Sequence, residues 1–463
     1  MFIEFQGRKR NEPQKANGKQ QAVAVDAVPV VRGPAIDPEL RDWLDLKSSL
    51  HEDLLERLNL SVIDKIEESE LKRQIGGLIS QLLAQKRRVL EPAKLQQLVS
   101  ELIFEVTGLG PLEPLLSDPT INDILVNSYD KVYVERFGVL EKTNVQFRDE
   151  PHLLRIIDKI VSAIGRRIDE SQPWVDARLA DGSRVNAIIR PCAVDGPALS
   201  IRKFSRNPLT LDRLVDNGAL TAHAADILRG LVRARLNVLI SGGTGSGKTT
   251  LLNAMSAYID HNERVVTIED AAELQLQQEH VVRLETRPAS TEGTGAIVQR
   301  DLVRNALRMR PDRIIVGEVR GTECFDMLQA MNTGHDGSMT TVHANTARDA
   351  LGRLEQMVTM LGADIPARTI RGQIASAIHV IVQLSRLSDG SRKIMSISEI
   401  AGMENDVVTL QDIFLFRKTG RNEKGEVQGE TYFTGVRPKF FEAFQAAGIN
   451  TQGLLLNERG KIE

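Results

Sequence analysis

Residues 238–250 read Val238-Leu239-Ile240-Ser241-Gly242-Gly243-Thr244-Gly245-Ser246-Gly247-Lys248-Thr249-Thr250. They hold a complete G-x-x-x-x-G-K-[ST] phosphate-binding loop between an apolar strand and the start of a helix, which is the setting that the motif requires. The glycines permit positive φ angles, so the backbone approaches a phosphate closely and successive N–H groups point at it from the positive end of the helix. We therefore predict that residues 242–250 bind a nucleoside triphosphate, with Lys248 on the β- and γ-phosphates and the Thr249 hydroxyl on Mg²⁺.

Composition and charge restrict the class of protein. The 463 residues suffice for two or three domains, and 59 Lys+Arg nearly balance 62 Asp+Glu, which gives no sign of a surface that coats nucleic acid. Cys192 and Cys324 lie far apart without metal ligands at useful spacing, as is typical of a reducing compartment. No apolar run reaches the roughly 18–20 residues that span a bilayer, and the first residues lack the order of a signal peptide. We expect a cytoplasmic protein that reaches a membrane only through a partner.

The first part of the chain is predicted to contain a leader and a helical bundle. Residues 1–38 are polar and aperiodic, so we expect a disordered leader. From 39 to 110 apolar residues recur at helical spacing, which predicts three amphipathic helices in a small bundle. The three sets are Leu54, Leu55, Leu58, Ile63 and Ile66; Ile75, Leu78, Ile79, Leu82 and Leu83; and Leu95, Leu98, Leu102, Ile103 and Val106.

Residues 111–205 are predicted to form an α+β domain with an antiparallel sheet, because short alternating strands surround one helical segment. The expected helix is His152–Ile164, and a tight turn is expected at Asp181-Gly182-Ser183. The expected strands are Ile124–Val126, Val132–Val134, Val175–Leu179, Arg184–Ile189 and Ala198–Phe204. Residues 206–212, which include Asn207-Pro208, are predicted to be a linker.

Residues 213–463 alternate strands with helices, as a parallel α/β sheet requires. The expected core strands are Val238–Ile240, Val265–Ile268, Arg313–Val316, Ser338–Thr341 and Val380–Gln383. A β-rich extension follows, with a charged, glycine-bearing loop predicted at Gly420–Gly429. The predicted fold class is α/β: a P-loop domain at the C-terminal side, preceded by the α+β domain and the helical bundle.

Two acidic segments follow apolar strands. Ile314-Ile315-Val316-Gly317-Glu318 matches a Walker B strand, and Glu318 is predicted to orient or deprotonate the water that attacks the γ-phosphate. Gly317 stands where an Asp is usual, so Mg²⁺ is expected to be held through water. Glu269, followed by Asp270 and Glu273, is predicted to help hold Mg²⁺ or the attacking water. The alternative for Glu318 is an exposed turn acid, and for each of the other three it is a helix N-cap or an acid in the first turn of a helix.

Two histidines and several arginines complete the candidate site. His335 and His343 flank a Gly/Thr-rich strand, and we predict that they sense the γ-phosphate; metal binding is the alternative, although no third ligand is at hand. The domain before the phosphate loop offers Arg178, Arg184, Arg190 and Arg202. Arginine provides the positive charge that a phosphoryl-transfer transition state needs, but arginines on strands are also ordinary surface residues.

The chain resembles the ATPases that drive type II and type IV secretion and type IV pili, and in particular the CpaF-type motor of tight-adherence (Tad) pili. The resemblance covers about residues 100–455 and excludes the leader. It rests on the phosphate loop and on the segments Gly108–Leu116, Val132–Arg136, Asp176–Asn186, Ser200–Phe204, Leu307–Asp312, Gly317–Arg320 and Gly334–Ser338.

The resemblance implies a homo-hexameric ring in which each subunit joins a PAS-like domain to a RecA-like motor domain. It implies that ATP binds between the two domains; together with the motifs above, this predicts Thr249, Glu269 and Glu318 around the Mg²⁺ ion. It places Glu269 in the "Asp box" and His335 and His343 in the "His box". It also implies that Arg184 and Arg202 approach the γ-phosphate when the domains close. In such motors Gly317 is ordinary.

The function expected from this resemblance is ATP hydrolysis that drives pilus assembly, with retraction as a further option, through platform proteins of the inner membrane. The ATPase would lie in the cytoplasm at the inner face of that membrane. Export of other substrates is one alternative. A RecA-like nucleic-acid motor is another, but the net charge of −3 and the scarcity of Tyr and Trp argue against direct nucleic-acid binding. A scaffold that binds ATP without turnover is a third.

Overall fold

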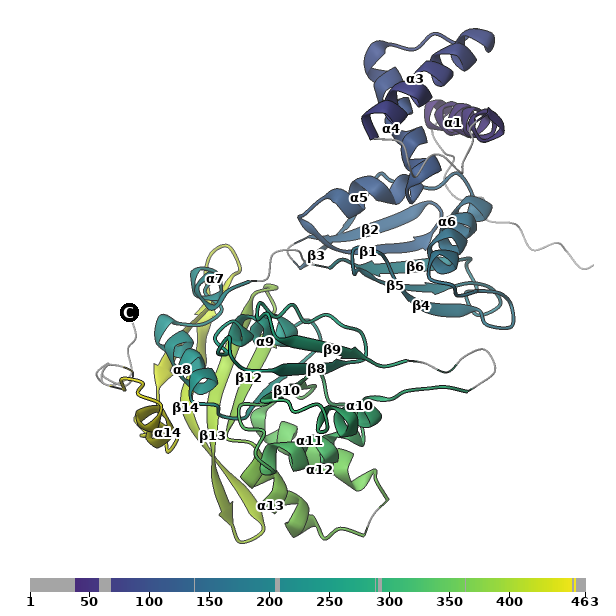
Figure 1. Ribbon diagram of the computed structural model, residues 1–463. Helices are drawn as coiled ribbons and strands as arrows, with labels where there is room; N and C mark the ends of the chain where they lie inside the picture. The colour runs from purple at the N-terminus through teal and green to yellow at the C-terminus, as the bar shows by residue number, and fades with distance from the viewer. Residues whose placement is uncertain are drawn as a thin grey trace, which may run out of the picture.

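The computed structural model describes residues 38–57, 68–136, 138–204, 209–287, 289, 294–362, 364–451 and 454. The predicted leader lies outside the described residues, except that its last residue, Pro38, begins a helix. Residues 206–208 of the predicted linker also lie outside them, and residue 211 already begins a helix. Figure 1 shows a helical bundle, a smaller sheet domain and a larger sheet domain that follow one another from top to bottom.

The N-terminal bundle consists of α1 (Pro38–Arg57), α3 (Glu68–Gln85) and α4 (Pro92–Thr107). Its core contains the predicted apolar residues of the second and third segments except Val106, and Leu50 and Leu54 from α1. The prediction for Leu55 is wrong, since this side chain is 40% exposed. Leu54 faces the core, and the next residue of a helix points about 100° away from it. Leu58, Ile63 and Ile66 lie outside the described residues.

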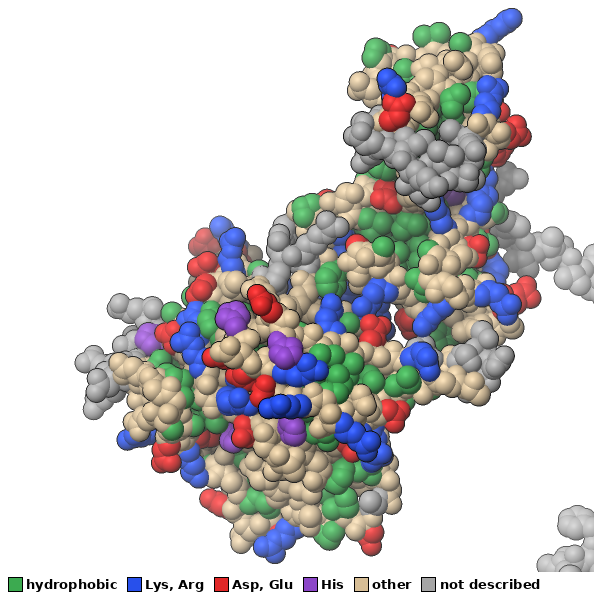
Figure 2. All heavy atoms as spheres, viewed as in Figure 1, with side chains coloured by type: hydrophobic (Ala, Val, Ile, Leu, Met, Phe, Trp, Pro, Cys, Tyr) green, Lys and Arg blue, Asp and Glu red, His purple; other side chains and the backbone are tan. Residues whose placement is uncertain are grey.

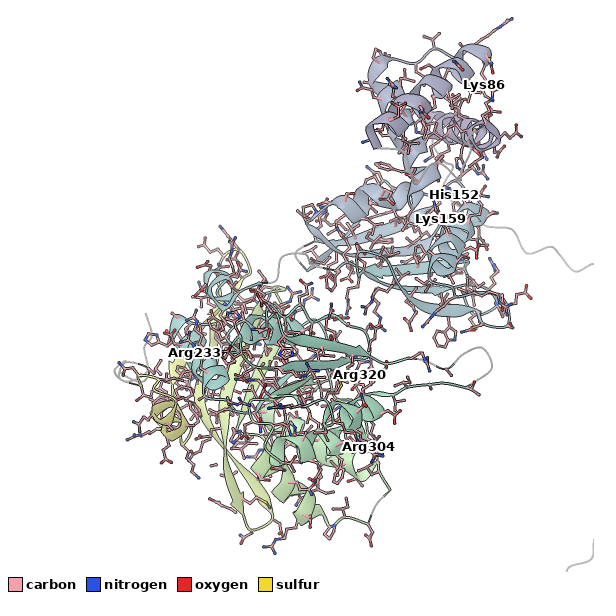
Figure 3. The ribbon with its side chains drawn as sticks, in the orientation of Figure 1. Lys86, His152, Lys159, Arg233, Arg304 and Arg320 are labelled. Carbon is pink, nitrogen blue, oxygen red and sulfur yellow. The ribbon has the colours of Figure 1, made fainter. Side chains whose placement is uncertain are left out.

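A buried ionic cluster joins the bundle to the domain below it. Glu105 of α4 contacts Lys47 of α1 at 3.0 Å and His152 of α6 (Glu150–Ala163) at 2.9 Å. Lys159, also on α6, donates to the Gly108 carbonyl at 2.6 Å and so caps the end of α4. Figure 3 shows His152 and Lys159 directly below the bundle. Burial alone would raise the pKa of Glu105, but the His152 hydrogen bond and the Lys47 charge outweigh it and lower the pKa to about 2.

Replacing Glu105 by Gln should lower the free energy of unfolding by about 2 kcal/mol near pH 7, because a charged hydrogen bond and its ion pair are lost. The pKa of Glu105 is depressed in the folded protein, so its stabilisation is present above the ordinary carboxyl pKa of 4.5 and is lost as the pH falls toward 2. Urea unfolding of both proteins should therefore show a difference at about pH 7 that shrinks at about pH 3. Glu56→Gln, an exposed change on α1, is the control and should leave the curve unchanged. A difference that does not vary with pH would contradict the assignment.

The middle domain has a six-stranded antiparallel sheet in the order β3-β2-β1-β6-β5-β4. Helix α6 packs on one face through Leu153, Ile156 and Ile160, while η1 (Gly110–Leu112) and α5 (Glu113–Ser117) lead into the sheet. The strands are β1 (Ile121–Ser128), β2 (Lys131–Arg136), β3 (Val139–Lys142), β4 (Trp174–Arg178), β5 (Arg184–Ile188) and β6 (Ala198–Arg202). The antiparallel α+β prediction is confirmed, although β3 was not expected. Side chains alternate between the two faces, so polar residues line the face opposite α6.

The larger domain is built on a nine-stranded sheet in the order β15-β14-β13-β12-β7-β11-β10-β8-β9. The strands from β12 to β9 run parallel, and apolar clusters cover both of their faces. These strands are β7 (Val238–Gly242), β8 (Val265–Glu269), β9 (Val281–Glu285), β10 (Arg313–Val316), β11 (Met339–Val342) and β12 (Val380–Arg386). The five predicted core strands are confirmed. β9 was not predicted, because most of its residues are only partly buried.

Helices cover both faces of the parallel strands. One face carries α7 (Leu211–Asp216), α8 (Ala222–Arg233), α9 (Lys248–Ser256) and, toward the end of the chain, α14 (Phe441–Ala446). The other carries α10 (Gln299–Ala306), α11 (Glu323–Asn332), α12 (Ala347–Thr359) and α13 (Ala367–Ala377). This doubly wound arrangement gathers the ligand-binding loops at the carboxyl edge of the strands.

The sheet continues into three antiparallel strands, β13 (Arg392–Glu404), β14 (Val407–Arg421) and β15 (Val427–Phe433). The predicted loop at Gly420–Gly429 is therefore too long, because β14 and β15 pair as far as Arg421 and Val427. Its charged residues Glu423, Lys424 and Glu426 do lie in the turn between the two strands, whereas Arg421 is the last residue of β14.

Candidate functional site

The phosphate loop connects the fully buried strand β7 to α9. Gly245 and Gly247 have φ angles of 68° and 95°, the left-handed region that favours glycine. A Cβ atom on Gly242 would lie 2.4 Å from the Ser246 hydroxyl and 2.9 Å from the Leu384 carbonyl, so this position also requires glycine. The loop thus presents backbone N–H groups at the positive end of α9, as a phosphate site requires.

Lys248 occupies the loop itself. Its ammonium group donates to the Gly242 and Gly243 carbonyls at 3.0 and 3.1 Å. Burial lowers the pKa of Lys248, with Glu318 acting in the opposite direction and Arg320 in the same one. These carbonyls are weak partners for a buried cation, which a phosphate would satisfy better.

Glu269 ends β8 and lies in the space beside Gly317. One carboxylate oxygen accepts hydrogen bonds from the Glu273 and Leu274 backbone N–H groups at 2.7 and 2.9 Å. The other oxygen, Oε1, is buried and has no partner among the described residues. Burial raises the pKa of Glu269 to about 7, and the two backbone hydrogen bonds counteract this only in part. A buried carboxylate oxygen without a partner indicates a place for a ligand, a metal-bound water or the attacking water.

The structure also explains why glycine precedes Glu318. A Cβ atom on Gly317 would lie 2.8 Å from Cγ of Glu269, because the Glu269 side chain occupies the place where an Asp at 317 would be. The carboxylate on this side of the site therefore comes from the neighbouring strand, β8, rather than from β10.

Gly317→Ala should displace Glu269 and lower the free energy of unfolding by about 1–3 kcal/mol, because the added methyl group overlaps a buried side chain. The rate of any reaction that uses Glu269 should fall as well. Gly352→Ala is the matched control, since nothing lies within 4 Å of the Cβ atom that it would add within α12. Thermal unfolding of both variants checks the prediction, and equal effects would show that Gly317 is not crowded.

Glu318 follows β10 and faces an arginine to which the sequence patterns assigned no role. Arg320 donates to Glu318 at 2.7 Å and lies 3.6 Å from Asp270. The hydrogen bond to Glu318 raises the pKa of Arg320. Figure 3 shows Arg320 beside the ends of β8 and β9, on the part of the larger domain that lies below the middle domain. Its position two residues after the Walker B acid is the signal that would have found it.

Three arginines of the middle domain form a row on the polar face of its sheet. Arg178 pairs in register with Arg184, and Arg184 with Arg202, on the adjacent strands β4, β5 and β6. Like charges directly opposite each other destabilise a sheet, so this row indicates an anion site. The side chains now contact Glu285 of β9 at 3.0 Å, Asp176 at 3.7 Å and Asp123 at 3.3 Å, respectively. The first of these ion pairs joins the two domains.

The arginine row faces the phosphate loop across a cleft between the two domains. All three arginines line a cavity of about 200 Å³ together with Thr249 and Thr250 of α9. A smaller cavity beside it brings Arg184 together with Thr249, Glu269, Glu318 and Arg320. Figure 2 shows Lys and Arg side chains gathered along this boundary, with Asp and Glu among them. Arg190 is not part of the group, since it pairs with Glu150 at 3.2 Å.

The two histidines lie at opposite ends of the central strand β11 (Met339–Val342). His343 follows the end of β11, at the edge of the phosphate loop, and its side chain is exposed. His335 precedes β11, and its Nδ1 lies 3.2 Å from the Ala330 carbonyl at the end of α11. The structure therefore does not bring His335 to the phosphate loop of its own chain. The strand predicted between the two residues is present as β11, and it holds them at its opposite ends.

The residues present fit a magnesium ion held mainly by the nucleotide. Thr249 and Glu269 line the same cavity, and Oε1 of Glu269 is buried without a partner among the described residues. Among the described residues no three His, Cys, Asp or Glu side chains form a metal cage. This agrees with the habit of Mg²⁺, which keeps several waters and binds through few protein ligands and the phosphates. Once bound, the ion would neutralise charge on the β- and γ-phosphates.

The chain belongs to the family described as Type II/IV secretion system protein, whose model matches residues 105–431. A Mycobacterium tuberculosis (strain H37Rv) protein, provisionally named for conjugal transfer, is 41% identical over 309 residues, covering 65% of this chain and 87% of that protein. Type IV secretion system protein VirB11 of Bartonella quintana is 32% identical over 334 residues, covering 63% and 92%. The crystal structure of the VirB11 ATPase from the Brucella suis type IV secretion system, in complex with sulphate, is 30% identical, covers 63% and 96%, and has a TM-score of 0.35.

The predicted α/β fold class is confirmed, with a doubly wound, mostly parallel sheet domain that carries the phosphate loop after an antiparallel α+β domain. Within the described part of the chain, no helix is both long and apolar enough to cross a membrane.

Proposed function

We propose that the protein hydrolyses ATP to ADP and phosphate and converts that reaction into movement of its middle domain against its motor domain. The observation that carries the proposal is the row of Arg178, Arg184 and Arg202, which faces Thr249 and Thr250 from another domain. A phosphoryl-transfer site needs cations around the γ-phosphate, and here the middle domain, not the domain with the phosphate loop, provides them. Binding of ATP would therefore draw the two domains together, and loss of the γ-phosphate would release them.

In the proposed reaction Glu318 activates the attacking water, and Glu269 holds that water or a metal-bound one. Lys248 transfers from the loop carbonyls to the β- and γ-phosphates, while Arg184 and Arg202 exchange their carboxylate partners for γ-phosphate oxygens. His343 follows the carboxyl end of β11, near the phosphate loop, where it can sense the γ-phosphate. The proposal does not use His335. We propose residues 206–212 as the hinge, and 39–110, 111–205 and 213–463 as the domains.

We further propose a homo-hexamer in the cytoplasm that works on platform proteins at the inner face of the inner membrane to assemble Tad or type IV pili. The resemblance of the motifs supports this reading. The names of the relatives favour a second candidate, a type IV secretion motor that exports other substrates. A RecA-like nucleic-acid motor is the third, and it predicts hydrolysis that DNA stimulates and salt suppresses.

The test is steady-state ATP hydrolysis by the purified chain over a range of protein concentrations, with Lys248→Ala beside it. Specific activity that rises and then levels off would support a site completed by assembly. Wild-type nucleotide affinity in Lys248→Ala would overturn the phosphate-loop assignment. Addition of single- and double-stranded DNA separates the nucleic-acid motor from the other two candidates.

A further inference from the structure

A second pair of arginines lies on the opposite flank of the phosphate loop from the row in the middle domain. Arg386 ends β12 and Arg392 begins β13, and the two residues are register partners in this antiparallel hairpin. β12 runs parallel to β7, with Leu384 opposite Gly242, so the hairpin leaves the sheet at the edge where the phosphate loop lies. Both side chains are exposed.

Both arginines contact the phosphate loop or the middle domain through carbonyl groups. Arg392 Nε donates to the Gly245 carbonyl at 2.9 Å, and its Cδ lies 3.4 Å from the Cβ position of Gly247. Arg386 Nη1 lies 3.6 Å from the Cβ position of Gly245, and its Nη2 donates to the Gly138 carbonyl in the turn between β2 and β3. The pair therefore touches the loop that binds phosphate and, through Arg386, the domain that closes over it.

No carboxylate forms an ion pair with either guanidinium group in the part of the chain that the structure describes. The arginine row, by contrast, has Glu285, Asp176 and Asp123. Two cations directly opposite each other on a hairpin repel, and carbonyl oxygens neutralise neither of them. An arrangement of this kind beside a phosphate loop is suited to an anion.

The hairpin that carries the pair is braced on several sides. Its turn closes through Leu387 N to Ser391 O at 2.7 Å, and Gly390 adopts a φ of 86°. Asp389 accepts from Ser391 Oγ at 2.7 Å and from Val427 N, at the start of β15, at 2.6 Å. The backbone that carries the two guanidinium groups is thus already ordered, so a ligand that binds there loses little free energy to ordering of the hairpin.

The order of the strands indicates which part of a bound nucleotide lies on the β12 side of the phosphate loop. Glu269 and Glu318, which mark the γ-phosphate end, follow β8 and β10 on one side of β7, whereas β12 lies on the other side. We propose that Arg386 and Arg392 bind the α- and β-phosphates of the nucleotide, so that they hold ADP as firmly as ATP. The arginine row, in contrast, would distinguish the two. The inference rests on the proposed function, because it assumes that the loop binds a nucleotide.

The test compares the Kd of mant-ADP and of the non-hydrolysable mant-AMPPNP for the full chain carrying Arg386→Gln, Arg392→Gln or both. Each single change should weaken both nucleotides by a similar factor of about ten, since each removes a charge-assisted hydrogen bond. Arg184→Gln should weaken mant-AMPPNP and leave mant-ADP unchanged. Arg417→Gln on β14, whose guanidinium stacks on Tyr432, is the control that should change neither.

An unchanged mant-ADP affinity in the double variant would overturn the inference. So would a loss confined to mant-AMPPNP, because that result would assign the pair to the γ-phosphate. Neither result would affect the proposed function, whose failure shows itself as wild-type nucleotide binding by Lys248→Ala. Circular dichroism of each variant establishes that the hairpin change has not unfolded the domain.

Discussion

Glu318→Gln should lower kcat for ATP hydrolysis by about 10²- to 10⁴-fold while the protein still binds ATP, because the amide cannot accept a proton from the attacking water. Glu318 lies at the carboxyl edge of β10, in one cavity with Thr249, Glu269 and Arg184, where the γ-phosphate would lie. The change also removes the negative charge beside Arg320, so that of its two ion pairs only the one with Asp270 remains. Single-turnover hydrolysis and the Kd of mant-AMPPNP, measured on the same preparation, separate the chemical step from binding.

The control for this prediction is Glu404→Gln, which neutralises an exposed carboxylate at the far end of β13. It should leave both kcat and the nucleotide Kd at the wild-type values. A Glu318→Gln protein that turns over at the wild-type rate would show that another group is the base. Glu269, whose pKa burial raises to about 7, would then be the residue to change next.

Arg184→Gln should lower kcat by about 10³-fold or more, since an arginine that reaches the transferred phosphoryl group stabilises the charge that develops there. Arg184 is the middle member of the row and the only one of the three that lines both the cavity above α9 and the smaller cavity with Glu318. Its present ion pair with Asp176 is long, at 3.7 Å, so little is lost when it turns to a phosphate. Arg184→Lys should recover only part of the rate, because lysine lacks the planar fork.

Arg190→Gln is the matched control, an arginine of the same domain that pairs with Glu150 and donates to the Val194 carbonyl instead. Steady-state kinetics of the three variants at saturating ATP provide the comparison. If Arg184→Gln lost no more activity than Arg190→Gln, the row would be a surface feature and the proposed closing of the domains would lose its main support.

Local patterns in the chain predicted the parallel core well. Strands such as Val265–Glu269 are short and buried on both faces, and the run Val265-Val266-Thr267-Ile268 identifies this one without reference to its neighbours. β3 and β9 escaped prediction because they lie at sheet edges, where half-exposed residues lack a distinctive pattern. The loop expected at Gly420–Gly429 is present but shorter, since the hairpin of β14 and β15 pairs as far as Arg421 and Val427.

Some residues of the site could likewise be predicted from the sequence, and others only from the tertiary structure. The phosphate loop, Lys248 and Thr249 are contiguous, so their chemistry is visible in the order of the residues alone. Glu269 and Gly317 come from different strands, and a Cβ atom on Gly317 would lie only 2.8 Å from the Glu269 side chain. Only the pairing of β8 with β10 shows that the Glu269 side chain leaves no room for a side chain at position 317. His335 and His343 were both expected to sense the γ-phosphate, but β11 places them at its opposite ends, and only His343 lies at the end where the phosphate loop is.

The sequence alone thus specified a nucleotide-binding α/β domain, because a phosphate loop acts through backbone geometry that adjacent glycines encode. Tertiary structure decided which charges meet that loop. Sheet register aligned Arg178, Arg184 and Arg202 from three strands, and strand order placed Arg386 and Arg392 on the opposite flank. Electrostatic interactions act through space over a few ångströms, so they depend on distances that the order of residues along the chain does not contain.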